Sequence, residues 1–138
     1  MIFTVEGLSP APQGSKRHVG GGRMIESSAK VKPWREAVRQ EALATNAPMA
    51  AGPVFVRITF RFNRPKGHLN TKGLIKPSAP IDHVTRPDLD KLVRSTLDGL
   101  TGALFTDDSQ VAFMVASKEY AAPGQREGAT IEVRIIDG

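Results

Sequence analysis

Two short acidic motifs contain the side chains best suited to chemistry. The first, RPDLDK, carries Asp88 and Asp90, and the second, TDDSQ, carries Asp107 and Asp108. Packed carboxylates repel one another unless a cation holds them, so we expect the first pair and one aspartate of the second to converge on a divalent cation. The chain has no cysteine and three histidines, so the ligands are mainly oxygens, which favour Mg²⁺ or Mn²⁺ over zinc. Metal-activated water at such a cluster is a nucleophile for phosphodiester hydrolysis.

These aspartates also have a purely structural explanation. Aspartate at a helix start caps free N–H groups and opposes the positive end of the dipole, which explains Asp88 by itself. It does not explain Asp90, which lies further into the helix, whereas Asp107 and Asp108 also suit a turn. Residues two apart on a regular helix point about 200° apart, so Asp88 and Asp90 can reach one ion only if the backbone of Asp88 is still extended. Asp98 precedes a glycine, and we expect it to make a surface contact.

The 138-residue chain is basic. It has 19 Lys and Arg against 14 Asp and Glu, a net charge of +5 and a pI near 9.9. The stretches 16–35 and 57–86 are strongly basic, and their acidic residues are Glu26 and Asp82, one in each. This distribution predicts an anionic partner such as nucleic acid, although a modest positive excess also serves solubility alone. The absence of cysteine excludes disulfide scaffolds, thiolate zinc sites and cysteine nucleophiles.

Hydrophobic periodicity predicts four strands and two helices. The strand at 54–63 alternates an apolar face with a face that carries Arg57 and Arg61, so one side is expected in the core and the other to be wet and cationic. The helix at 87–101 has an apolar stripe at helical spacing. The other expected elements are strands at Ile2–Glu6, 111–116 and 129–136 and a helix at 32–45.

Proline, glycine and hydroxyl residues predict the connections and the helix starts. Ser27 or Ser28 could cap the first helix. For the second, Thr85 with Asp88 resembles a capping box, and Pro87 suits the first turn. Proline and glycine are dense in the two long basic connections, so we expect no regular structure there. The predicted mobile basic loops are 9–32 and 64–86.

The order β-α-β-α-β-β predicts an α+β fold in a single domain over 1–138. We expect a mixed or antiparallel sheet with both helices packed on one face and long basic loops beside it. No apolar run approaches the length of a membrane helix, and the N-terminal sequence lacks a charged segment before an apolar stretch. We therefore expect a cytoplasmic protein with no membrane partner.

An acidic cluster within a basic chain favours a metal-dependent nuclease. In such an enzyme the cations bind the phosphate backbone while the carboxylates hold an ion at the reacting phosphate. One alternative is a non-catalytic module that binds structured nucleic acid. A second is a small regulatory or phage accessory protein that keeps the fold without the chemistry. A third is a hydrolase of small phosphates, which the spread of cations over two long loops argues against.

The two motifs together resemble the RusA family of Holliday junction resolvases. The run RPDLDKLVRSTLDGL at 86–100, followed by TDDSQV at 106–111, is similar to the family pattern. The similarity extends to the N-terminal strand ending near a proline, a basic loop at 15–17 and Lys118 in the strand after the second motif, so it covers most of the chain. It implies a homodimeric endonuclease that cuts four-way DNA junctions with Mg²⁺ or Mn²⁺ during recombination and repair.

Matched residue by residue, the resemblance implies Asp88, Asp90 and Asp108 as metal ligands, with Asp107 in support. Two positions depart from the family pattern. Lys91 replaces the usual Asn, and Arg94 replaces the usual catalytic Lys. Arginine can stabilise charge on a phosphorane but does not give up a proton near neutral pH. Either Arg94 supplies positive charge only, or Lys91 takes over the catalytic role. An ordinary ion pair with Asp90, four residues away, also explains Arg94.

DNA and a second copy of the chain are the partners that this hypothesis needs. A junction is cut at two related positions, and a two-fold dimer presents two identical sites. Apolar residues left over from the core stripe, such as Phe55, Phe113 and Met114, are candidates for the dimer interface. The residues expected to contact DNA are Lys16, Arg17, Arg23, Arg57, Arg61, Arg86 and Lys118.

Overall fold

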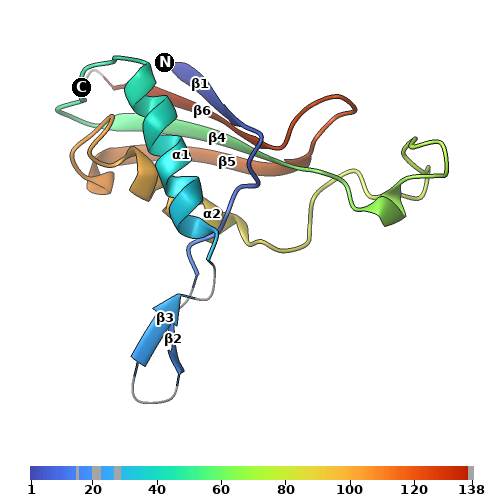
Figure 1. Ribbon diagram of the computed structural model, residues 1–138. Helices are drawn as coiled ribbons and strands as arrows, with labels where there is room; N and C mark the ends of the chain where they lie inside the picture. The colour runs from blue at the N-terminus through green and yellow to red at the C-terminus, as the bar shows by residue number, and fades with distance from the viewer. Residues whose placement is uncertain (15, 20–22, 27–28, 137–138) are drawn as a thin grey trace.

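The computed structural model describes residues 1–14, 16–19, 23–26 and 29–136. A four-stranded sheet has both helices on one face (Figure 1). The strands lie in the order β1-β6-β4-β5; β4 and β5 are parallel, and the other pairs are antiparallel. The order along the chain of the elements of this unit is β-α-β-α-β-β, so the predicted α+β fold with a mixed sheet is confirmed. The strands are β1 (Ile2–Glu6), β4 (Val54–Phe62), β5 (Val111–Tyr120) and β6 (Gly128–Ile135).

The central strand β4 shows the alternation that the sequence predicts. Val54, Val56, Ile58 and Phe60 are fully buried toward the helices, whereas Arg57 on the other face is exposed. A long connection joins β4 to the second helix, and the next strand, β5, pairs parallel with β4. This is the arrangement of a β-α-β unit. The helix-facing side of the sheet is therefore the core, and the opposite side is open.

Helix α1 (Val31–Ala44) buries Val31, Trp34, Val38 and Ala42 on one stripe. Its N-cap is Lys30, which makes no side-chain cap bond, so the predicted cap is wrong; Ser27 and Ser28 lie outside the described residues. Pro33 is the third helical residue. Backbone N–H groups in the first turn have no partner within the helix, so the N–H that proline lacks costs no hydrogen bond there.

Helix α2 (Leu89–Leu100) packs closely against α1. Trp34 Nε1 donates to Thr96 Oγ1 at 3.1 Å, between two fully buried residues. Gly99 allows the close approach, because a Cβ there would lie 2.9 Å from the carbonyl oxygen of Arg35. These contacts fix α2 against α1 and the core. None of the helices in the described ranges is long and apolar enough to cross a membrane.

Two predicted local features are wrong. The N-terminal loop contains an antiparallel pair, β2 (Lys16–Val19) and β3 (Arg23–Glu26), which projects away from the sheet (Figure 1). Short stretches on either side of a glycine run can pair as a hairpin, which the proline and glycine count concealed. The capping box at Thr85 is also absent, because Asp88 is the N-cap and Pro87 lies outside the helix.

The remaining boundaries differ modestly from the predictions. Strand β5 continues four residues beyond the predicted end at 116, because pairing with β4 extends to Tyr120. The connection between β4 and α2 holds one short 3₁₀ turn, η1 (Lys66–His68), and otherwise no helix or strand, as expected for 64–86. Whether the two basic connections are mobile stays a prediction.

Candidate active site

Asp88 and Asp90 lie at the N-terminal end of α2. Asp88 is the N-cap, with an extended backbone (φ −70°, ψ 138°), and its side chain makes no cap bond. The helix therefore leaves its carboxylate available. Both side chains are exposed. The extended backbone at Asp88 is the condition under which two carboxylates at this spacing can face one ion.

Lys118 holds the segment that leads into α2. From the helix-facing side of β5, its Nζ donates to the carbonyl oxygens of Thr85 at 2.7 Å and Pro87 at 3.0 Å. The Leu92 amide then donates to the Asp88 carbonyl at 3.2 Å as the first helical bond. The position of Asp88 thus depends on a cation thirty residues later in the chain. Lys118 therefore has a structural role in this chain, and its expected contact with DNA stays a prediction.

The second aspartate pair lies in a tightly bonded turn, η2 (Asp108–Gln110). Asp107 Oδ1 accepts from the Ser109 amide at 2.8 Å. The hydrogen bonds from Ser109 lower the pKa of Asp107 below its usual value. The Asp108 side chain is exposed. Asp107 is therefore engaged in the turn, whereas Asp108 is the more open carboxylate of the pair.

Gln110 positions this turn, a role that the sequence reasoning missed. Its Oε1 accepts from the amides of Thr106 at 2.9 Å and Asp107 at 3.0 Å. Its Nε2 donates to the carbonyls of Ala50 at 3.0 Å and Gly52 at 2.9 Å. A capping-box spacing, with Asp107 three residues before Gln110, was the available sequence signal.

The two aspartate pairs lie at opposite ends of α2. The helix has 12 residues and is about 18 Å long. Asp88 is near Lys118, toward the end of β5, whereas Asp108 precedes the first residue of that strand, about 23 Å away along it. Within the part of the chain that the structure describes, no three acidic or histidine side chains form a group that could hold a metal ion. One chain therefore brings together Asp88 and Asp90 but not all the expected ligands.

Three cationic residues surround the first pair. Arg86 and Arg94 are exposed, and Lys91 is half-buried beside Asp88. The ion pairs among the described residues do not include one between Arg94 and Asp90, so the simple structural explanation of Arg94 has no support here. Asp98 does make the predicted surface contact, with Arg35 at 3.7 Å.

The other expected DNA contacts fall into different environments. Arg61 lies on the same sheet face as Arg57, as expected, but it is 6% exposed and donates to Thr130 Oγ1 at 2.9 Å, so its expected exposure to solvent is wrong. Arg57 is exposed on that face and lies 3.8 Å from Glu132. Lys16 and Arg17 belong to β2, and Arg23 belongs to β3.

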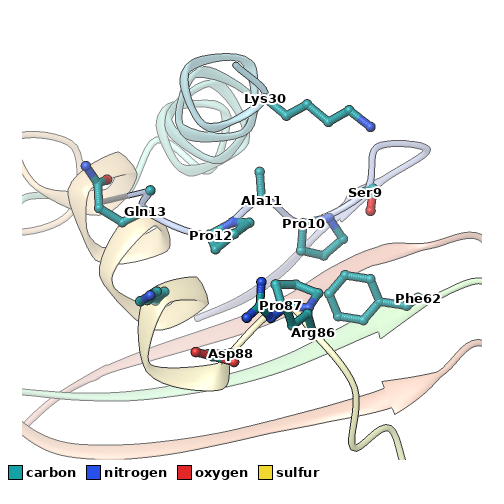
Figure 2. Close-up of a pocket in the computed structure, with 12 residues that line it drawn as sticks. Ser9, Pro10, Ala11, Pro12, Gln13, Lys30, Phe62, Arg86, Pro87 and Asp88 are labelled. Atoms are coloured by element: carbon teal, nitrogen blue, oxygen red, sulfur yellow. The ribbon is translucent and has the colours of Figure 1, made fainter. Parts of the chain in front are cut away.

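A cavity of about 490 Å³ lies beside Asp88. Figure 2 shows Ser9, Pro10 and Pro12 along one side, with Pro87 and Asp88 along the other. The rest of its lining consists of Ala11, Gln13, Gly14, Lys30, Phe62, Arg86 and Lys91. The candidate site therefore combines carboxylates, cations and an apolar hollow.

An aromatic cluster fixes the end of the long loop that precedes this site. The His83 ring packs 4.6 Å from Phe62 and 4.8 Å from Tyr120, and Arg64 lies 4.5 Å over Tyr120. Burial, followed by the charge of Lys118, lowers the pKa of His83 below 6.5. The sequence reasoning missed this cluster, because its members are far apart in the chain and follow no motif.

Strand β5 is an edge strand that carries exposed apolar side chains on the sheet face away from the helices. The strand lies at the edge of the sheet, and among the described residues its outer edge pairs at Glu119 with Asp82. Phe113 is 61% exposed and Val115 is 48% exposed. Of the other dimer candidates, Met114 packs against the core, and Phe55 lies under the Arg134 guanidinium.

Comparison with known proteins identifies a family and a relative. The family model described as endodeoxyribonuclease RusA matches residues 8–135. A Bacillus subtilis (strain 168) protein described as "Uncharacterized protein YqaN" is 30% identical over 131 residues, which cover 86% of this chain and 87% of the relative. Both similarities extend over most of the chain, and the range of the family match spans the positions of both aspartate motifs.

Proposed function

Because the chain belongs to the RusA family of endodeoxyribonucleases, which act on DNA junctions, we propose that it resolves four-way (Holliday) junctions by phosphodiester hydrolysis during recombination and repair in the cytoplasm. The observation that carries this proposal is the exposed Asp88–Asp90 pair on a fixed helix start. Arg86, Lys91 and Arg94 on the same segment provide positive charge for the phosphate backbone.

The proposed cofactor is Mg²⁺, with Mn²⁺ as a substitute. These ions take oxygen ligands, and two exposed carboxylates of one chain make too small a set for a closed site. The described residues of a single chain thus do not fit the ion by themselves. We propose that Asp108, supported by Asp107, joins Asp88 and Asp90 of the partner subunit in a homodimer. When bound there, the ion supplies Lewis acidity at the reacting phosphate.

The edge strand β5 offers a way to build this dimer. If two copies of β5 pair antiparallel about a two-fold axis, the start of each strand lies beside the end of the other. Asp108 lies just before the start of β5, and Lys118 near its end holds the segment leading into Asp88. The pairing would therefore bring the two aspartate pairs of different chains together, with exposed Phe113 and Val115 next to the contact.

In this proposal the cations have separate roles. Arg94 lies one helical turn after Asp90 on α2, and its exposed guanidinium stabilises the charge that develops on the phosphate. Lys91 lines the cavity together with Asp88 and binds the backbone of the DNA strand beside the site. The Arg94 side chain gives up no proton, so any general acid must be water or Lys91.

Junction cleavage with matched substrates tests the function. We expect the wild-type chain to cut a mobile four-way junction near its crossover in Mg²⁺ or Mn²⁺, to leave linear duplex of the same sequence largely intact, and to stop in EDTA. Asp90→Asn should keep junction binding, or strengthen it because a charge that repels phosphate is gone, and lose cutting by at least about 100-fold.

Other outcomes distinguish the alternatives. Equal cutting of linear duplex would reduce the function to a general nuclease. Junction binding without cutting in either metal would favour a non-catalytic binder with the same fold, in which Asp90→Asn changes binding only slightly. Salt dependence of binding cannot make this distinction, because phosphate contacts weaken with salt in both cases.

A further inference from the structure

The cavity beside Asp88 is not needed to hold a metal ion, and its lining suggests a ligand of its own. Its walls combine proline rings with cationic side chains, and Asp88 belongs to both the cavity and the proposed site. A volume of about 490 Å³ lies within the range of small-molecule sites. A ligand there would be apolar on its faces and anionic at one end, and it would lie directly beside the reacting phosphate.

We propose that this cavity receives one nucleotide of the DNA strand next to the scissile phosphate, with its base out of the stack. Pro12 and Pro87, which are partly exposed, present apolar ring surfaces against which a base of any sequence can pack, and the buried Pro10 lies behind them (Figure 2). Arg86 and Lys91 lie at the same cavity and match the phosphates on either side of the sugar. The inference rests on the proposed junction nuclease function and names a substrate subsite for it.

The cavity wall is held in place before any ligand binds. Ser95 Oγ, which is fully buried in α2, donates to the Ala11 carbonyl at 2.6 Å. The Gln13 amide donates to the Lys91 carbonyl at 3.0 Å. These bonds tie the segment at 10–13 to the same helix that carries Asp90. A preformed wall reduces the entropy cost of ordering the site on binding, so a single unstacked base can contribute measurably to the affinity for DNA.

The subsite also gives a physical reason for choosing a junction over linear duplex. Taking a base out of a continuous duplex costs a few kcal/mol, and the cost is lowest where pairing or stacking is already disturbed. The crossover of a four-way junction is such a place. The cavity would therefore favour binding to branched DNA over linear duplex without any sequence-specific contact.

Fluorescence of 2-aminopurine provides the direct test. Cleavage is first mapped on a four-way junction, and 2-aminopurine is then placed at each nucleotide flanking the cut. Wild-type chain is added in EDTA so that the DNA remains intact. We expect fluorescence at one flanking position to rise on binding, because the base leaves the stack. Ser9→Trp, which fills the cavity from its rim, should remove the rise, whereas Ala44→Trp, at the exposed far end of α1, should keep it.

A change on the DNA side makes the test independent of how well the variant folds. On an intact junction, Ser9→Trp should cut about tenfold more slowly than wild type, the scale of one stacking contact. With an abasic nucleotide at the responding position, wild type should slow to a similar extent, and Ser9→Trp should add no further loss. Normal binding and cutting with no fluorescence change and no abasic effect overturns the subsite alone. Failure of the wild-type chain to bind junctions overturns the proposed function and the subsite with it.

Discussion

The ammonium nitrogen of Lys118 lies 3.0 Å from the carbonyl oxygen of Pro87, so the end of β5 is bonded directly to the residue before Asp88. The same nitrogen bonds Thr85 at 2.7 Å. A lysine in this position could equally have been a phosphate contact, as the sequence suggested. The two bonds also give it a second role, as a positioning residue for the first carboxylate of the candidate site.

Replacing this lysine separates the two roles. Lys118→Met keeps the length of the side chain and removes both bonds, so we expect stability to fall by about 1–3 kcal/mol. Junction cleavage should fall by more than tenfold because Asp88 loses its fixed position, with little change in junction affinity or in its salt dependence. Urea unfolding, a binding titration at several salt concentrations and single-turnover cleavage measure these quantities. If affinity falls and its salt slope becomes shallower while the rate at saturation is unchanged, Lys118 is a phosphate contact after all.

Mixing two inactive variants tests whether the site is shared between chains. We expect Asp90→Asn and Asp108→Asn to be inactive alone. In a heterodimer purified through two different tags, one composite site would contain both changes and the other neither. Cutting should therefore return at about half the wild-type initial rate, as nicks in one strand. If both ligand pairs belong to one chain, each site carries one change, and the mixed dimer stays as inactive as its parents.

Because Arg94 stands where the family usually has lysine, we expect the substitution Arg94→Lys to preserve cleavage activity. Arg94→Lys keeps a positive charge one turn after Asp90, so the single-turnover rate should stay within about threefold of wild type or rise above it. Arg94→Met, the uncharged control of similar size, should lose about 100-fold or more. A large loss in Arg94→Lys would mean that the guanidinium geometry matters, and that the match to the family's lysine position is mistaken.

The four strands of the main sheet and both helices could be predicted from the sequence, because each shows hydrophobic periodicity over its own residues. The alternation in β4 and the stripe in α2 are strong because each element has one buried face. The hairpin β2–β3 was missed because its four-residue strands carry almost no periodic signal among glycines and prolines. Its pairing is set by the register between strands, which no single short strand encodes.

The candidate site could be predicted residue by residue but not as an assembly. Asp88 and Asp90 were recognised from their spacing, and the extended backbone that the pair needs is present. The distance between them and Asp108 depends on how α2 packs beside β5, which is a tertiary property. The burial of Arg61 was missed for a similar reason, because its partner Thr130 belongs to a strand that adjoins β4 only in the folded sheet.

The buried His83 predicts a loss of stability in mild acid. Burial, followed by the charge of Lys118, lowers its folded-state pKa below 6.5. Above about pH 6.5 the imidazole is neutral in both states. As the pH falls further, the unfolded chain binds the proton first, so the free energy of unfolding decreases until the folded-state pKa is reached. His83→Phe should remove this contribution while keeping the ring contacts with Phe62 and Tyr120. Urea unfolding between pH 7 and pH 5 should therefore show a shallower decline in the variant, and equal slopes would show that His83 is not responsible.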